Sequence, residues 1–187
     1  MIVRPELLAP AGDMNKLKTA VHFGADAVYA AGKAFGLRAF SGNFTDAEIA
    51  EAAKYLHNQG KKLYITVNIF ARNSDFGLLK EFIKILENAN VDGVIVSDTG
   101  VAAFIKKYSK LDIHLSTQAN TTNKYAVDFW KDFGIKRVVL ARELSIDEIR
   151  EIADYVAGKV ELEAFIHGAM CMAYSRGGVI GCVVVLV

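Results

Sequence analysis

Short apolar runs alternate along this chain with longer segments in which hydrophobic residues recur every three or four positions. The short runs have the length and composition of β-strands, and the longer segments have the periodicity of amphipathic helices. Seven runs are predicted as strands: 6–9, 27–31, 63–68, 93–97, 113–117, 137–141 and 160–166. Strands that alternate with helices in this way form parallel sheets with right-handed crossovers.

The helices between these runs have recognisable ends. Thr45 and Glu48 have the spacing of a capping box, and Ser145 and Glu148 repeat it before the last helix. Asp13 is predicted to cap the first helix. Each helix carries an apolar stripe, which we interpret as core packing rather than as a cofactor site. One such stripe consists of Leu78, Leu79, Phe82, Ile83 and Leu86.

Seven strands with helices between them favour a TIM-like (βα) barrel. No Gly-x-Gly-x-x-Gly sequence follows the first strand, which argues against a dinucleotide-binding fold. A complete barrel has eight strands and about 250 residues, more than the 187 residues of this chain. The barrel is therefore expected to be incomplete, or to be closed by a strand from the apolar C-terminal segment 179–187.

Alternate side chains of a barrel strand point inward, and those at the carboxyl ends of the strands form the active site. Three strands reserve one face for mostly polar residues, which we predict to be the inner face. These residues are Tyr64, Thr66 and Asn68 on the third strand, His114, Ser116 and Gln118 on the fifth, and Glu161, Glu163, Phe165 and His167 on the seventh. A shift of one residue in register would turn each set outward.

These inward residues predict a substrate pocket that Asn68, His114 and Gln118 line, together with Arg142 after the sixth strand. The segment 32–43, which follows the second strand, is long for a connection at this end and adds Arg38 and Asn43 to the predicted substrate-binding set.

The two arginines of this set suggest an acidic substrate. Arg38 and Arg142 suit bidentate recognition of a carboxylate, although either could form a surface ion pair. A synthase- or aldolase-like barrel enzyme is therefore an alternative. The lack of lysine at the inward positions disfavours Schiff-base chemistry in such an enzyme.

Composition mainly excludes classes of function. A formal net charge of +1 gives no overall electrostatic argument for nucleic acid or for an acidic membrane. No apolar run reaches the roughly 20 residues that span a bilayer, and the N-terminus has no signal-peptide pattern. With only two cysteines, the expected location is the reducing cytoplasm, without a membrane partner.

Cys171 follows the seventh strand and lies four residues after His167. A lone cysteine is most often a small buried hydrophobic residue. Next to His167, however, its thiol could act as a nucleophile or ligate a metal. His167 would then serve as acid/base or ligand, and Glu163 would orient it or act as a base. No zinc-protease, P-loop or serine-hydrolase motif is present.

The segment around this cysteine resembles the signature of peptidase family U32, Glu-x-Phe-x-x-Gly-(Ser/Ala)-x-Cys. The matching residues are Glu163, Phe165, Gly168, Ala169 and Cys171. Further blocks similar to the family lie at 6–12, 24–29, 37–44, 64–68, 114–118 and 140–143. The chain is therefore identified as a member of this family over residues 6–175.

The resemblance implies a barrel-like catalytic domain, assigned here to residues 1–175, in a bacterial or archaeal cytoplasmic protein. The family is named for collagenase-like proteolysis, so peptide hydrolysis is the first expected function, with Glu163, His167 and Cys171 as catalytic residues. Other members hydroxylate uridine or cytidine in RNA and use several cysteines for an iron–sulfur cluster. Hydroxylation of tRNA or rRNA is accordingly the alternative, and the expected substrate is a peptide or an RNA.

The resemblance stops after Ser175, where the family pattern continues with a glycine and, two residues later, a second cysteine. Arg176 and Gly178 occupy those positions here. Cys171 could be one cluster ligand, but only Cys182 remains besides it, so a cluster is not expected in this chain. We hypothesise that 176–187 is a truncated or frame-shifted end. The chain would then be inactive and could self-associate through its apolar C-terminal segment.

Overall fold

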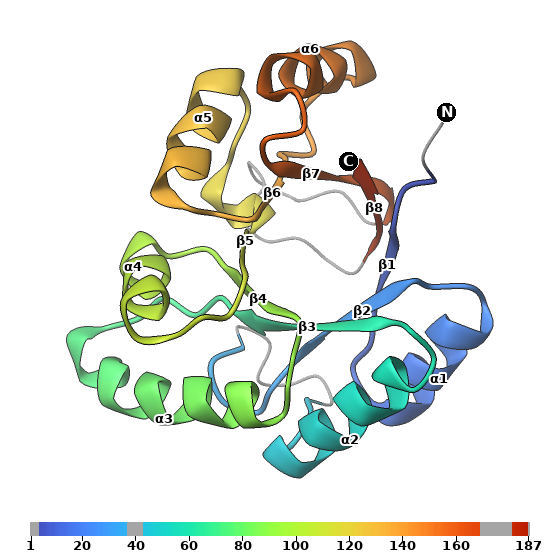
Figure 1. The fold of residues 1–187 in the computed structure, drawn as a ribbon, viewed down its shortest axis with the longest axis vertical. Coiled ribbons are helices and arrows are strands. Elements are labelled where there is room, and N and C mark those ends of the chain that lie inside the picture. Colours follow the sequence, from blue (N-terminus) through green and yellow to red (C-terminus); the bar gives the residue numbers. More distant parts are fainter. Residues whose placement is uncertain (1–3, 37–42, 169–180, 187) are drawn as a thin grey trace.

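The apolar runs form a closed β-barrel in the computed structural model, which describes residues 4–36, 43–168 and 181–186 (Figure 1). Strands β1 to β7 follow one another around the barrel and pair in parallel. Their bounds are β1 (Leu7–Pro10), β2 (Ala27–Ala31), β3 (Lys62–Val67), β4 (Gly93–Val96), β5 (Ile113–Leu115), β6 (Arg137–Val139) and β7 (Glu161–Gly168). The predicted TIM-like barrel is therefore confirmed.

The C-terminal segment supplies a further strand, β8 (Gly181–Leu186), which closes the barrel. β8 runs antiparallel to both of its neighbours, pairing Leu162 of β7 with Leu186 and Leu7 of β1 with Val184. In a complete TIM barrel the eighth strand is parallel to the others. Because β8 pairs with β1 and β7, the barrel lacks the open edge on which the self-association prediction relied.

Helices α1 to α6 lie around the outside of the barrel (Figure 1). Their bounds are α1 (Met14–His22), α2 (Asp46–His57), α3 (Phe76–Asn88), α4 (Thr99–Tyr108), α5 (Lys124–Phe133) and α6 (Ile146–Val156). Asp13 caps α1, and both predicted capping boxes form at the starts of α2 and α6. The caps satisfy backbone N–H groups that a helix leaves without internal partners.

The strands separate two apolar clusters, and this separation confirms the predicted side-chain parity. Leu63, Ile65 and Val67 of β3 belong to the outer cluster, which the helices cover. Between them in the sequence, Tyr64 belongs to the inner cluster with Leu8, Ala27 and Ile95. Side chains of alternate residues on one strand point to opposite faces, so Tyr64 of β3 points into the barrel as predicted.

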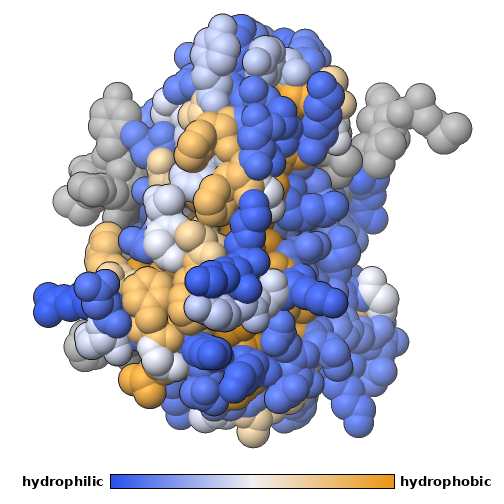
Figure 2. All heavy atoms as spheres, turned by 60° about the vertical axis from the view of Figure 1, so that its left-hand side comes forward, coloured by the Kyte–Doolittle hydropathy of each residue, from blue (hydrophilic) through white to orange (hydrophobic). Residues whose placement is uncertain are grey.

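Two sequence predictions need correction. Leu78, placed in the core stripe of its helix, is 70% exposed, whereas Leu79, Phe82 and Ile83 are buried. Figure 2 shows hydrophobic and hydrophilic residues side by side on the face that its view brings forward. Strands β3, β4, β5 and β6 also end one or two residues earlier than predicted. Several polar residues predicted at strand ends therefore lie in the loops at the carboxyl end of the barrel, called the mouth below.

One further property concerns membranes. Across the residues that the structure describes, every helix is too short or too polar to cross a bilayer.

Candidate functional site

Two amide side chains meet at the mouth. Asn68 directly follows β3, and Gln118 lies in the 3₁₀ turn Thr117–Ala119 after β5. Nδ2 of Asn68 donates a hydrogen bond of 2.9 Å to Oε1 of Gln118. The Ser116 hydroxyl donates to the same oxygen at 3.4 Å, and the Ser97 hydroxyl donates to the Asn68 carbonyl at 3.4 Å. Residues that follow three strands thus form one polar surface.

Gln118 reaches this surface for a reason that differs from the prediction. Strand parity placed it inward, but β5 ends at Leu115 and the chain turns at Ser116. The Ser116 hydroxyl accepts a hydrogen bond of 3.3 Å from the Gln118 backbone N–H and so caps the turn. The parity argument therefore does not apply to Gln118, although the predicted proximity of Asn68 and Gln118 is observed.

Arg142 stacks on an aromatic ring of the next strand. Its guanidinium carbon lies 3.8 Å from the centre of the Phe165 ring. Arg142 follows β6, and Phe165 is a half-buried residue of β7 that packs against the inner cluster. A cation held over a ring face gains an attractive interaction, and the planar guanidinium suits further stacking with flat groups.

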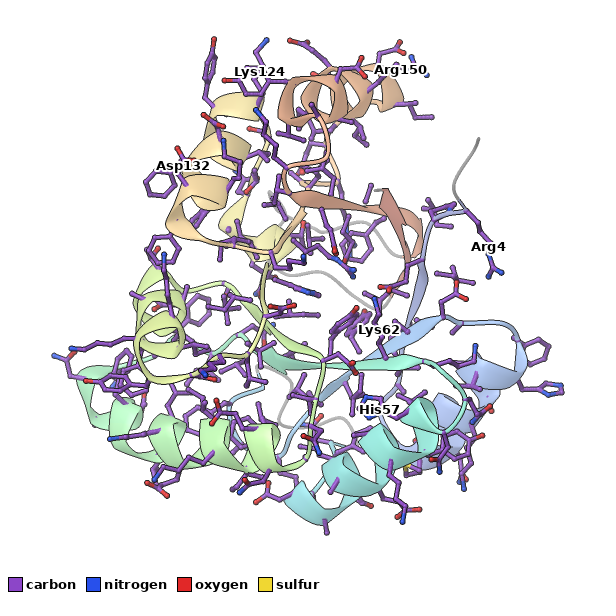
Figure 3. All side chains as sticks on the ribbon, viewed as in Figure 1. Arg4, His57, Lys62, Lys124, Asp132 and Arg150 are labelled. Carbon is purple, nitrogen blue, oxygen red and sulfur yellow. The ribbon has the colours of Figure 1, made fainter. Side chains whose placement is uncertain are left out.

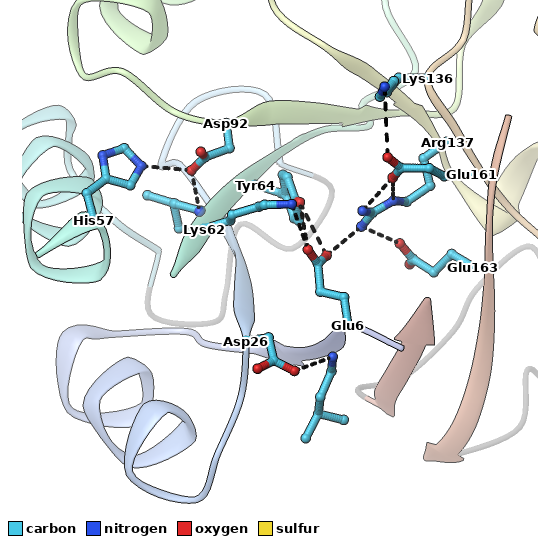
Figure 4. A network of polar contacts seen from close by, with 12 residues as sticks. Glu6, Asp26, His57, Lys62, Tyr64, Asp92, Lys136, Arg137, Glu161 and Glu163 are labelled. Carbon is cyan, nitrogen blue, oxygen red and sulfur yellow. Dashed lines mark hydrogen bonds and ion pairs between the residues drawn. The ribbon is translucent and has the colours of Figure 1, made fainter. Parts of the chain in front are cut away.

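The opposite half of the interior contains a network of buried charges centred on Arg137 (Figure 4). Its guanidinium nitrogens lie 2.6 Å from Glu161, 2.9 Å from Glu6 and 3.5 Å from Glu163. The Arg137 side chain is only 3% exposed. Lys62 bonds to Glu6 at 2.9 Å, and the Tyr64 hydroxyl donates to Glu6 at 3.2 Å. Charges buried this deeply persist only when partners compensate them.

Glu163 is the least compensated carboxylate of this network. Burial raises its pKa to about 7, although Arg137 opposes the rise. Its contact with Arg137, at 3.5 Å, is longer than those of Glu6 and Glu161. Burial also disfavours ionisation of Glu6, but Arg137 and Lys62 lower the pKa of Glu6 overall. Glu163 is therefore the carboxylate of this group that can exchange a proton near neutral pH.

His114 lies in the same interior layer. Its ring centre is 4.5 Å from that of Tyr64, and the residue is 2% exposed. Burial, together with the charge of Arg137, lowers the pKa of His114 well below its usual value, so the imidazole is neutral. Its Nδ1 atom is buried without a hydrogen-bond partner among the described residues.

The structure thus divides the predicted site residues into two groups. Asn68, Gln118 and Arg142 lie at the mouth. His114 and Glu163 point into the barrel as predicted, but their contacts are with Tyr64 and Arg137 rather than with the mouth residues. The single pocket predicted from parity is therefore two sites, because inward positions on different strands lie at different depths in a barrel.

The remaining predicted residues are less completely described. Asn43 lies beside the end of β2, since its neighbour Phe44 pairs with Gly32. The backbone of His167 belongs to β7, opposite Cys182 of β8. Arg38 and Cys171 lie outside the described residues. The catalytic and binding roles assigned to this set from the sequence stay predictions.

Arg137 and Glu6 were not predicted from the sequence, although one signal could have found Arg137. Val138 packs in the outer cluster, so the neighbouring position on β6 must point inward. The same parity that identified His114 and Glu163 therefore applies to Arg137.

The family resemblance implied an iron–sulfur cluster in some members. In the described ranges no group of three or more histidine, cysteine or acidic side chains is placed to hold a metal ion. Such a cluster needs several thiolates, so we derive no chemical step through one.

Comparison with known proteins decides the family. The model of peptidase family U32 matches residues 12–183, which is most of the chain. The chain belongs to peptidase family U32. This assignment confirms the sequence-based identification.

Curated relatives of this U32 chain carry two kinds of name. The tRNA hydroxylation protein P1 of Bacillus subtilis is 50% identical over 173 residues, which are 92% of this chain and 40% of the relative. An uncharacterized protease of Methanocaldococcus jannaschii is 41% identical over 94% of this chain and 43% of its own length. A collagenase of Porphyromonas gingivalis is 35% identical over 91% of this chain and 43% of its own length. The U32 chain therefore spans about two fifths of these relatives.

A solved structure supports the same fold. The U32 peptidase Mk0906 superposes with a TM-score of 0.71 and 16% sequence identity, over 89% of this chain and 69% of that one. At this identity the likeness establishes the barrel fold alone.

Proposed function

We propose that this U32 chain is the barrel domain of a protein that acts in hydroxylation of tRNA nucleosides, with the mouth as the surface that receives the nucleoside. The observation that carries the proposal is the stacking of Arg142 on Phe165 at 3.8 Å, at the end of the barrel where the Asn68–Gln118 amide pair lies. Proteins recognise unpaired RNA bases by stacking on aromatic or guanidinium planes and by hydrogen bonding to base edges. Both kinds of group are present here.

The names of the relatives agree with this choice. The Bacillus subtilis protein is named for tRNA hydroxylation, and so is a Haemophilus influenzae protein that is 46% identical over 92% of this chain. The formal net charge of +1 means that base contacts, rather than a broad basic surface, would supply much of the affinity of this domain.

The test is to express this chain in a bacterial strain that lacks its own tRNA hydroxylation gene and to quantify hydroxylated tRNA nucleosides by mass spectrometry. Binding of the purified chain to tRNA is measured in parallel. We expect tRNA binding that Asn68→Ala weakens and that Asn88→Ala, an exposed control on α3, leaves unchanged. Absence of both nucleoside restoration and tRNA binding would overturn the proposal.

Peptide hydrolysis is a second candidate, because the Methanocaldococcus jannaschii and Porphyromonas gingivalis relatives are named as a protease and a collagenase. In this case Cys171 would act as nucleophile or ligand, His167 as acid/base, and Glu163 as base or orienting group. If the chain hydrolyses peptides, the purified protein should cleave gelatin, and Cys171→Ala should abolish this cleavage. Cleavage that survives this substitution would remove Cys171 from the mechanism.

We extend the proposal to location and assembly. A protein that acts on tRNA is expected in the cytoplasm, which fractionation of cells that express the chain can check. Self-association through the apolar segment 179–187 is supported only by its composition, because β8 is already paired on both sides. A molar mass that stays monomeric across concentrations in light scattering would exclude such an oligomer.

A further inference from the structure

A cavity opens at the amino ends of the strands, at the opposite end of the barrel from the mouth. Its volume is about 300 Å³. The residues that matter for the argument are Lys62, Tyr64, Asp112, His114, Lys136 and Glu161. They come from the amino ends of β3, β5 and β7 and from the residues just before β5 and β6. Pockets of about this volume are at the lower end of those that hold small molecules.

A buried imidazole is among the groups that line the cavity. His114 is almost fully buried, and its Nδ1 atom makes no hydrogen bond with any described residue. A buried polar atom left unpaired costs free energy, so such atoms are rare in folded proteins. A Cβ atom at Gly93 would lie 3.5 Å from Nε2 of His114. Glycine at this inward position therefore adds no side-chain atom next to Nε2 of the imidazole.

The charges around the cavity are balanced. Lys62, Lys136 and Arg137 contribute positive charge, and Asp92, Asp112 and Glu161 contribute negative charge. An ion of one sign would meet as many repelling as attracting groups. A molecule that carries both charges can place each opposite its complement.

Among the charged side chains that line the cavity, one basic and one acidic group have weak ionic contacts, or none, with the described residues. Lys136 is 54% exposed, and its Nζ lies 3.9 Å from Glu161, at the limit of an ion pair. Asp112 is exposed, and its carboxylate forms no ion pair or hydrogen bond with the described residues. By contrast, Asp92 is bound to His57 at 2.9 Å and to the Leu63 N–H at 2.8 Å. Asp112 and Lys136 are therefore the pair available to a ligand.

We infer that this cavity is a binding site for a free α-amino acid or a closely related small zwitterion, with Asp112 facing the ammonium group, Lys136 facing the carboxylate, and His114 and Tyr64 facing the side chain. Charge-assisted hydrogen bonds at both ends would orient the ligand. The site is separate from the mouth and does not depend on tRNA or peptide chemistry. Figure 3 places Lys62, which lines the cavity, near the barrel, far from the peripheral residues Lys124, Asp132 and Arg150.

The test uses the full chain and the standard L-amino acids as probes, first by thermal shift and then by calorimetry. We expect at least one amino acid to bind, and Asp112→Asn and Lys136→Gln each to weaken it roughly ten-fold or more. The exposed positions Asp154 and Lys54 supply the controls Asp154→Asn and Lys54→Gln, which should bind as the unchanged chain does. Amide signals of Gly93 and Asp112 in NMR spectra should shift on binding.

Two derivatives of the binding amino acid test the zwitterion requirement. The N-acetyl derivative lacks the ammonium charge and the amide derivative lacks the carboxylate, so each should bind roughly ten-fold more weakly or worse. Three results would overturn the inference: no amino acid binds, both cavity variants bind normally, or the derivatives bind as well as the amino acid. None of these results bears on the function proposed for the mouth.

Discussion

Arg137 and Glu161 face each other across neighbouring strands, and their side chains form the shortest contact of the buried charge network. The register of β6 and β7 pairs the two residues, and the guanidinium lies 2.6 Å from the carboxylate. The same guanidinium also contacts Glu6 and Glu163. Arg137 is thus the cation that compensates three carboxylates from β7 and the chain before β1.

Arg137→Met should therefore destabilise the fold strongly. Removal of one partner from a buried ion network leaves uncompensated charge and typically costs about 3–5 kcal/mol. Arg137→Lys should cost less, because the charge remains while the fork geometry is lost. The free energy of unfolding in urea measures both effects.

The control for this experiment is Arg150→Ala. Arg150 pairs with Asp147 one turn away on α6, and both side chains are largely exposed. Exposed pairs contribute about 0–1 kcal/mol. If Arg137→Met costs no more than Arg150→Ala, the buried network does not stabilise the barrel.

Glu163 should make stability depend on pH near neutrality. Burial raises its pKa in the folded chain from 4.5 to about 7. Between these values the folded state binds more protons than the unfolded state, so this group makes stability fall as pH rises through the interval. The full effect is about 3 kcal/mol. Glu163→Gln, which cannot ionise, should lack this dependence.

The measurement is the free energy of unfolding of both proteins from pH 4 to 8. The free energy of unfolding of Glu163→Gln should increase relative to that of the unchanged chain as pH rises toward 8. Glu81→Gln, at an exposed position on α3, is the control and should follow the unchanged chain. A difference between Glu163→Gln and the unchanged chain that stays constant with pH would show that Glu163 has the same pKa in both states.

The periodicity of apolar residues was sufficient to predict the barrel, because this periodicity reflects which side chains are buried. Leu63, Ile65 and Val67 alternate with Tyr64 and Thr66, and that alternation fixes which face meets the helices. The capping boxes were predictable because their contacts are local in sequence. The direction of β8 was not predictable, since an apolar run carries no information on whether it pairs in parallel or antiparallel.

The site was only partly predictable, because depth in the barrel depends on register between strands. His114 and Asn68 share inward parity, yet one contacts Tyr64 and the other Gln118. The contact between Arg137 and Glu6 joins residues 131 positions apart, so no local sequence pattern could predict this contact. The sequence therefore indicated which side chains enter the barrel but not which of them meet.

Arg142→Ala should weaken tRNA binding if the mouth receives a nucleoside. Loss of a stacking surface for one base typically costs about 1–3 kcal/mol, roughly a 5- to 150-fold change in affinity. Arg142→Lys should recover little of this loss, because an ammonium group keeps the charge but not the plane. Fluorescence anisotropy with labelled tRNA measures the affinities at fixed salt.

Arg72→Ala, at an exposed position before α3, controls for the loss of one positive charge. It should reduce affinity by only a small, salt-dependent factor. Equal effects of Arg72→Ala and Arg142→Ala would mean that Arg142 acts through charge alone, contrary to the stacking role.

Two glycines should respond in opposite directions to the same substitution. Gly134, which ends α5, has φ of +99°, and a Cβ there would lie 3.0 Å from Nζ of Lys106. An L-residue in this left-handed conformation costs about 1–2 kcal/mol, so Gly134→Ala should destabilise the chain. Gly77 is the second residue of α3, and a Cβ there would meet nothing within 4 Å. Gly77→Ala should stabilise the chain through helix propensity, by at most the roughly 0.5–1 kcal/mol of a helix interior. Midpoints of urea unfolding compare the two variants, and a stabilising Gly134→Ala would contradict the left-handed end of α5.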